Sequence, residues 1–297
     1  MNRKTALVLS LLTNIVFFLL GKKKHRGHRE GHKKQLTHLV VLFDHRYPEQ
    51  LRHSLSFWKE HTPSTEKTDI ALLLCSTARK RDASKLDELE YTVKALIGRN
   101  LDECFASIQI VHAAVPASVM EQGEQRKYIL ERIFEGKIEI KNAGYVLITD
   151  PFVVPAQPDW LARLAERVRY PASEFWILGS INKGNQEIDG KEEVKPAYKA
   201  KFLRILSPAV YNLADRKFVG LCLSVLRNMP ERRTFDTELY RKIYEPSNFD
   251  HSRAYIHKYV YTDMIRAYWK SHLRIPSDRN VLLVHNIKGG DIEDSTT

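Results

Sequence analysis

A chain of 297 residues with 43% hydrophobic and 10% aromatic side chains can bury the core of one large domain or of two small ones. This composition excludes an intrinsically disordered protein. The formal net charge is +11, but residues 1–34 contain nine Lys or Arg and one Glu, which leaves only +3 for the remaining chain. Because the basic charge is confined to the N-terminal segment, we do not expect nucleic acid as a partner. Three cysteines, Cys75, Cys104 and Cys222, describe neither a disulfide framework nor a metal cluster.

The N-terminal segment has the pattern of a membrane anchor. Arg3 and Lys4 precede an apolar run from Thr5 to Leu20, which as a helix is about 24 Å long, against about 30 Å for a bilayer's hydrocarbon core. This length suits the apolar region of a signal peptide, or a short anchor in a thin early-secretory membrane. No small-x-small cleavage site follows, so we predict an uncleaved single-pass anchor at 1–21. A flexible basic stem is predicted at 22–35.

The first half of the remaining chain alternates between apolar strand patterns and amphipathic helix patterns. This alternation predicts a parallel sheet with helices on both faces. No GxGxxG follows the first predicted strand and no GxxxxGK[ST] occurs, which argues against a dinucleotide-binding Rossmann domain and a P-loop NTPase. The predicted strands lie at 39–43, 69–75, 107–113 and 145–149, and the predicted helices lie around 51–58, 86–97 and 125–134.

The second half has a less regular pattern. A helix is predicted at 159–170, a short strand at 174–180 and a polar loop at 182–195, which is rich in Gly and charge. Two short segments at 202–207 and 209–213 follow. The last predicted elements are a helix at 218–227, segments at 235–240 and 257–264, a strand at 280–285 and a flexible acidic tail at 291–297.

The most informative stretch surrounds Asp150. The apolar run 145–149 ends abruptly at this acidic residue, and a proline-rich loop then leads to Trp160 at the start of a helix. In an open α/β sheet, ligands bind outside the carboxyl ends of the strands, so a carboxylate at this point faces the ligand crevice. The alternative is a solvated Asp at an ordinary strand end.

The order of these segments resembles that of nucleotide-diphospho-sugar transferases with the GT-A glycosyltransferase fold, in particular single-pass glycosyltransferase-like membrane proteins of eukaryotes. The resemblance spans most of 37–290, so we predict a GT-A-like domain at 36–290. It implies a mixed, mostly parallel sheet flanked by helices. The stretches that carry it are 145–161, 175–180, 209–212 with Asp215 and Phe218, 235–244 and 257–265.

The resemblance implies transfer of a sugar from a nucleotide sugar to an acceptor hydroxyl of a glycan, protein or lipid. In the GT-A pattern an Asp-x-Asp or Glu-x-Asp at the end of the fourth strand holds Mn²⁺ or Mg²⁺, and a late His often completes the metal site. Here Asp150 stands with one carboxylate missing, and His285 is in the place expected for the late His, with an ordinary histidine at a strand end as its alternative. Two alternatives stay open: cations such as Lys199, Lys201 and Arg204 meet the diphosphate without a metal, or the chain is an inactive binding or scaffold protein.

Other residues are assigned to the site in the same way. Asp236 is the predicted catalytic base, with a helix N-cap as its alternative role. Asp263 is the second candidate, and a buried structural pair of Asp263 with His257 is its alternative.

Nucleotide-sugar binding is predicted for Asp150, Arg126, Lys201, Gly179 and Ser180. The default interpretation of Arg126, and of the neighbouring Lys127, is a solvated helix face. Four aromatic residues are expected in the core rather than stacked on a sugar, and these are Trp160, Phe175, Trp176 and Tyr211.

The sequence gives two conflicting indications of the compartment and argues against one class of enzyme. The resemblance implies a Golgi or endoplasmic reticulum membrane with a lumenal domain, whereas the basic flank after residue 21 favours a cytoplasmic domain by the positive-inside rule. No Gly-x-Ser-x-Gly occurs, which argues against a hydrolase with a nucleophile elbow. The enzyme hypothesis requires Asp150, Asp236 and His285 to meet in one pocket, whereas a scaffold needs no such convergence.

Overall fold

The computed structural model describes residues 35–78, 83–119, 121–181, 204–230, 233–244, 253–270 and 278–287. The predicted anchor at 1–21, the stem up to residue 34, the loop at 182–195 and the tail at 291–297 lie outside these ranges and stay predictions. Within the described ranges, no helix is both long enough and apolar enough to cross a membrane.

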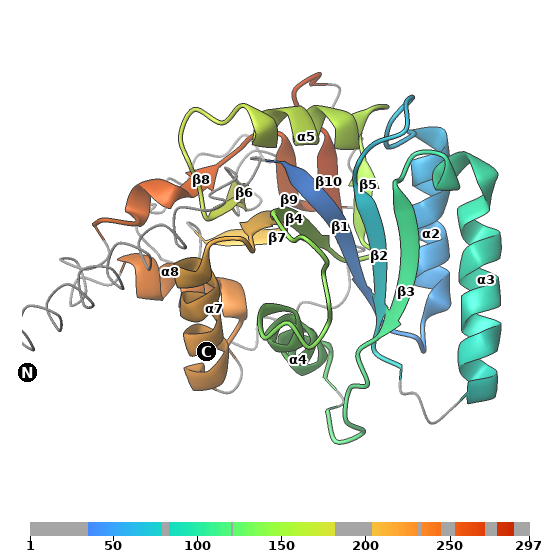
Figure 1. Cartoon of the computed structure of the whole chain (residues 1–297), viewed down its shortest axis with the longest axis horizontal. Helices are drawn as coiled ribbons and strands as arrows, with labels where there is room; N and C mark the ends of the chain where they lie inside the picture. The colour runs from blue at the N-terminus through green and yellow to red at the C-terminus, as the bar shows by residue number, and fades with distance from the viewer. Residues whose placement is uncertain are drawn as a thin grey trace, which may run out of the picture. The chain divides into compact units, whose positions relative to one another are not determined.

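A seven-stranded sheet in the order β3-β2-β1-β4-β7-β6-β8 forms the centre of the domain (Figure 1). Neighbouring strands run parallel except where β7 pairs with β4 and β6, both antiparallel. The strands are β1 (Leu36–Phe43), β2 (Ala71–Ser76), β3 (Ser107–His112), β4 (Tyr145–Thr149), β6 (Ile177–Ile181), β7 (Ile205–Asn212) and β8 (Tyr259–Tyr261). The predicted mixed, mostly parallel sheet is confirmed.

Most residues of β1, β2 and β4 are apolar because both faces of these strands are covered. Successive side chains point to opposite faces of a sheet, so Leu39 and Val41 of β1 pack into one hydrophobic core, whereas Val40 and Leu42 pack into another. The sheet therefore separates two cores, and helices lie on both faces as predicted.

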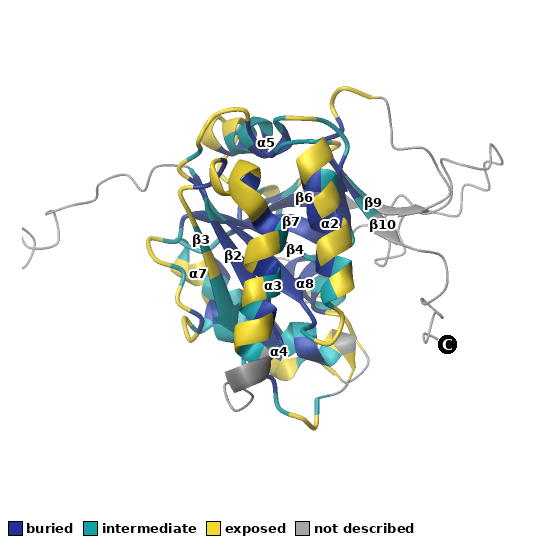
Figure 2. Ribbon diagram, turned by 90° about the vertical axis from the view of Figure 1, so that its right-hand side faces the viewer, coloured by how far each residue is buried: buried dark blue, intermediate teal, exposed yellow. Residues whose placement is uncertain are grey.

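One face is covered by α2 (Pro48–Glu60), α3 (Ala83–Asp102) and α5 (Trp160–Arg169) (Figure 1). The helical spacing of Leu51, Leu55 and Trp58 places these side chains on the buried side of α2. Figure 2 shows the outward sides of α2 and α3 exposed, with buried strands behind them. The other face is covered by α4 (Gln122–Phe134), α7 (Arg216–Asn228) and α8 (Phe235–Tyr244).

A second, three-stranded sheet in the order β5-β10-β9 was not predicted. Its strands are β5 (Val153–Pro155), β9 (Ile265–Lys270) and β10 (Leu283–Ile287). Strand β5 begins three residues after Asp150, and β10 pairs with it antiparallel, with His285 opposite Val153. This small sheet therefore brings the C-terminal part of the described chain to the end of β4.

Three predicted boundaries are corrected. The two segments predicted at 202–207 and 209–213 contribute to one strand, β7 (Ile205–Asn212), because Pro208 is accommodated within it. The segment 257–264 contains a short 3₁₀ helix (Ile256–Lys258), β8 and a turn, and both His257 and Asp263 are exposed, so they are not a buried structural pair. The last predicted strand begins at Leu283 rather than at residue 280.

Candidate functional site

The switch point of the large sheet lies between β1 and β4. The chain runs from β1 outward to β2 and β3, and then crosses to the other side of β1 to form β4. Ligand crevices of open α/β sheets lie at such points, outside the carboxyl ends of the strands. Asp150 follows β4 directly, and it is therefore placed where the sequence predicted a ligand-facing carboxylate.

Asp150 is surrounded by groups that favour its ionised form. Its Oδ1 accepts hydrogen bonds from the Phe152 amide (3.0 Å) and from His285 Nε2 (3.1 Å), and its Oδ2 lies 3.7 Å from Arg126 Nη1. Burial acts to raise the pKa of Asp150, but His285, Arg126 and the Phe152 amide together outweigh burial and lower the pKa to about 2. The carboxylate is therefore negatively charged at neutral pH.

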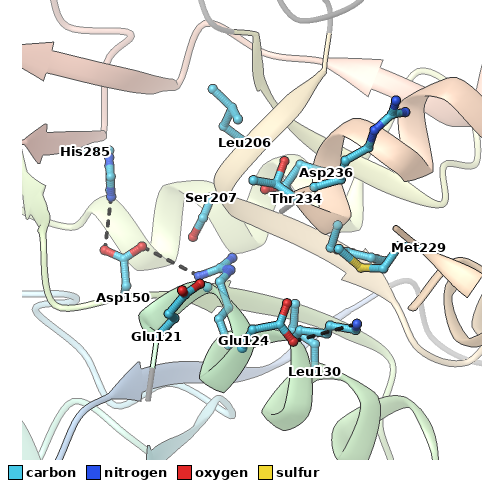
Figure 3. A pocket seen from close by; sticks show the side chains of 15 residues that line it. Glu121, Glu124, Leu130, Asp150, Leu206, Ser207, Met229, Thr234, Asp236 and His285 are labelled. Atoms are coloured by element: carbon cyan, nitrogen blue, oxygen red, sulfur yellow. Dashed lines mark hydrogen bonds and ion pairs between the residues drawn. The ribbon is translucent and has the colours of Figure 1, made fainter. Parts of the chain in front are cut away.

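Two other elements aim side chains at this carboxylate (Figure 3). His285 comes from β10, and Figure 3 shows its ring pointing at Asp150. The Phe152 ring lies 6.3 Å from the His285 ring and is nearly perpendicular to it. Arg126 comes from the first turns of α4 and is 24% exposed. Three segments that are far apart in the sequence thus meet at the end of β4.

Asp236 lies across the same cavity, in the first turn of α8 (Figure 3). Its Oδ1 is buried without a hydrogen-bond partner. Burial raises the pKa of Asp236 and Asp150 adds to this, although Arg126 and Arg204 act to lower it. The helix-capping alternative is not supported, because the Thr234 hydroxyl accepts the hydrogen bond from the Thr237 amide (3.4 Å).

The cavity has a volume of about 560 Å³, which is in the range of small-molecule sites. Asp150, Asp236 and His285 all line it, so the convergence that the enzyme hypothesis requires is present. A second cavity of about 770 Å³ beside α3 and β3 contains none of the predicted site residues. The first cavity is lined by Glu121, Gly123, Glu124, Arg126, Lys127, Leu130, Asp150, Leu206, Ser207, Met229, Arg233, Thr234, Phe235, Asp236 and His285.

Several predicted residues lie elsewhere. Gly179 and Ser180 are within β6, where Ser180 is buried and an added Cβ at Gly179 would meet Ile205. Neither lines the cavity, and the same holds for Asp263, which is exposed in the turn between β8 and β9. Lys199 and Lys201 lie outside the described residues.

The contacts of the remaining residues singled out in the sequence support helix starts or the hydrophobic core. Arg204 does not line the cavity and instead donates hydrogen bonds to Thr234 and Thr237 at the start of α8. Asp215 caps α7 by accepting from the Lys217 and Phe218 amides, at 2.9 and 3.2 Å. The four aromatic residues expected in the core are buried there, as predicted: Trp160, Phe175, Trp176 and Tyr211.

The sequence interpretation overlooked a polar cluster beside this site. Asp44 follows β1 and accepts hydrogen bonds from the Arg46 backbone and guanidinium and from the Thr77 hydroxyl. Burial acts to raise the pKa of Asp44, but the hydrogen bonds and charge of Arg46 and the Thr77 hydroxyl lower it. The signal that identified Asp150, an acidic residue at the end of an apolar strand, also occurs at Asp44.

The described residues do not fit the expected Mn²⁺ or Mg²⁺. Hard divalent cations require several oxygen ligands, whereas the predicted pair is one carboxylate and one imidazole that are hydrogen-bonded to each other. The guanidinium of Arg126 stands beside the same carboxylate. Across the described ranges, no group of three or more His, Cys, Asp or Glu side chains is arranged to hold a metal.

Comparisons with known proteins give similarities of backbone arrangement alone. No protein-family model matches the chain. No curated protein matches it in sequence.

Among solved structures, the galactosyltransferase LgtC, in complex with donor and acceptor sugar analogues, has a TM-score of 0.48 and 11% identity over 85% of this chain and 88% of its own. Mouse xyloside xylosyltransferase 1, apo form, has a TM-score of 0.46 and 10% identity, covering 84% of this chain and 97% of its own. The glycosyltransferase GlyE of Streptococcus pneumoniae TIGR4 has a TM-score of 0.41 and 8% identity, covering 77% of this chain and 45% of its own. These TM-scores are below 0.5, so the similarities carry no conclusion about the substrate or chemistry of this chain.

Proposed function

We propose that the chain is a glycosyltransferase that moves a sugar from a nucleotide-sugar donor to an acceptor hydroxyl in the cavity between Asp150 and Asp236. The observation that carries this proposal is the convergence of Asp150, His285, Arg126 and Asp236, from four separate elements, in one cavity of about 560 Å³. The order of sequence segments that resembles the GT-A fold gives independent support. A protein without a ligand has no need of such a cluster.

The reaction assigns a different task to each side of the cavity. The acceptor oxygen forms a bond to the anomeric carbon of the sugar, and the bond from that carbon to the diphosphate oxygen breaks. The acceptor proton passes to a carboxylate, and the electron pair of the broken bond leaves with the nucleoside diphosphate. The protein must therefore supply a base on one side and a positive charge on the other.

Asp236 is suited to the task of base. Asp236 lines the cavity, and its Oδ1 has no competing hydrogen bond. Because burial raises its pKa, the ionised carboxylate binds a proton more strongly than an ordinary exposed Asp does. A base with a pKa closer to the working pH is the more effective catalyst.

Arg126 is suited to meet the charge of the leaving diphosphate. It lies next to ionised Asp150, which together with His285 and the Phe152 amide forms a fixed set of contacts at the end of β4. In this arrangement Asp150 positions Arg126 and His285 and accepts hydrogen bonds from donor hydroxyls. Groups that are held in place before the reaction stabilise developing charge without having to reorganise.

The substitution Asp150→Ala tests the site. It removes the group that holds both Arg126 and His285, and misplacing such groups by about 1 Å costs roughly 100-fold in rate. We expect the release of nucleoside diphosphate from a panel of nucleotide sugars, in the presence of carbohydrate acceptors, to fall by about that factor. The matched control is Asp87→Ala, at an exposed position of α3 on the other side of the sheet.

Circular dichroism establishes that both variants are folded. Turnover by Asp150→Ala at the wild-type rate would contradict the assignment of the active site to this cavity. Binding of nucleotide sugars without turnover by the wild-type chain would identify it as a binding protein instead of an enzyme.

A further inference from the structure

A guanidinium of the protein, that of Arg126, provides positive charge at the end of β4. Arg126 Nη1 lies 3.7 Å from Asp150 Oδ2. The same guanidinium acts on the ionisation of both Asp150 and Asp236, the two carboxyl groups on opposite sides of the cavity. Arg126 of α4 is therefore in contact with the carboxylate at the end of β4, and it lines the same cavity as Asp236.

The contacts of Asp150 leave a divalent metal at a disadvantage. One oxygen accepts two hydrogen bonds, from Phe152 and His285, and the other faces Arg126. A metal ion bound here would lie close to a guanidinium, and two neighbouring cations repel each other. Asp150 and His285 are the predicted metal ligands, and they are hydrogen-bonded to each other. A metal ion would therefore have to break that hydrogen bond in order to bind to them.

The other cations at the cavity already have acidic partners. Lys127 Nζ lies 3.8 Å from Glu124 Oε2, and Arg233 Nη1 lies 2.8 Å from Glu238 Oε1. Both residues line the cavity, so they contribute to its rim. Arg126 differs from them because its partner, Asp150, lies at the end of β4, where the ligand crevice of such a sheet is expected.

We propose that Arg126 takes the place of the divalent metal in this site and that the nucleoside diphosphate binds to it directly. This inference rests on the proposed function. A guanidinium presents a planar set of donors that matches the oxygens of a phosphate. The substrate class is therefore a nucleotide sugar that binds without Mn²⁺ or Mg²⁺.

Calorimetry on the full chain tests this inference. Protein stripped of metal with EDTA is titrated with UDP, GDP, ADP and CDP, first without metal and then with Mn²⁺. We expect the same Kd in both conditions for the nucleotide that binds. Arg126→Ala should weaken nucleotide binding about tenfold or more. Arg126→Lys keeps the charge but loses the planar donor set, so its Kd should lie between those of the wild type and Arg126→Ala.

Arg132→Ala is the matched control, because this arginine lies on the same helix but does not line the cavity. Its Kd should equal that of the wild type. Binding that requires Mn²⁺ would overturn the inference while leaving the proposed function intact, and so would an unchanged Kd in Arg126→Ala.

A titration with Mn²⁺ alone, followed by electron paramagnetic resonance, provides a readout without any nucleotide. We expect no bound Mn²⁺ that depends on Asp150, and Mn²⁺ binding that Asp150→Asn removes would overturn the inference. Folded protein that binds no nucleotide would overturn the proposed function and the role of Arg126 together.

Discussion

Asp236 lines the cavity, and its surroundings disfavour the ionised form of its carboxyl group. Its pKa is raised by burial, so the ionised form that a base requires is less stable here than in water. A folded-state pKa above the unfolded one contributes stability below the unfolded pKa, and this contribution is lost as the pH rises through the folded pKa. Once it is ionised, the Asp236 carboxylate therefore lowers the stability of the fold.

This conflict predicts opposite effects of Asp236→Asn on activity and stability. The rate of transfer should fall by about 100-fold to 10,000-fold, because the amide cannot accept the proton, whereas the thermal midpoint at pH 7 should rise. In the wild type, kcat/KM should increase with pH through the raised pKa of Asp236, and the variant should lose this dependence. Scanning calorimetry and a pH–rate profile check both parts, and a stable variant that keeps its pH dependence would exclude Asp236 as the base.

Individual site residues could be predicted where a local pattern marked them. Asp150 stands out because it ends an apolar run, and His285 and Asp236 were assigned through the resemblance. The contact of Arg126 with Asp150 is not visible in the sequence, since it depends on how α4 packs beside β4. Gly179 and Ser180, which are predicted to bind the nucleotide sugar, lie within strand β6, which continues through them to Ile181, and neither lines the cavity.

At the level of elements, β6 and β7 are held at close distance by the absence of a side chain at Gly179. A Cβ at this position would meet the Ile205 side chain and would lie 3.1 Å from Ala209 Cβ. Overpacking of this kind costs about 1–3 kcal/mol. We expect Gly179→Ala to lower the free energy of unfolding by that amount, as measured by urea denaturation.

A second expectation follows because Gly179 is not among the residues that line the cavity. Nucleotide binding by Gly179→Ala should stay at the wild-type level, because Gly179 lines no part of the cavity. Lost binding in a variant with unchanged stability would restore Gly179 to the donor site.

Long apolar strands and amphipathic helices could be predicted from their periodicity, and the strands β1 to β4 lie where the pattern placed them. The small sheet could not be predicted. Strand β5 has only three residues, and β10 pairs with it across more than a hundred residues of sequence. Short strands of this kind are defined by their partners, so their own sequence carries little periodic signal.

At the level of the whole domain, Asp150 links the site to the pH dependence of folding. Its pKa is lowered from 3.8 to about 2 in the folded state, because its partners outweigh the effect of burial. A folded-state pKa below the unfolded one gives stability that is present above the unfolded pKa and is lost as the pH falls through the folded pKa. At 1.36 kcal/mol per unit, this shift corresponds to about 2 kcal/mol.

We therefore expect the wild type to be more stable than Asp150→Asn by about 2 kcal/mol at pH 6. The difference should shrink between pH 4 and pH 2, where Asp150 becomes protonated. Urea denaturation of both proteins across this range gives the difference directly, and other acidic groups contribute equally to both. A difference that does not change with pH would mean that the fold does not lower the pKa of Asp150.

The central claim is that the cavity at the end of β4 binds a nucleoside diphosphate. The most direct test is a calorimetric titration of the full wild-type chain with UDP, GDP, ADP and CDP, repeated with Arg126→Ala. The account predicts saturable binding of at least one nucleotide to the wild type and a loss of that binding in the variant. Folded wild-type protein that binds none of the four would contradict it.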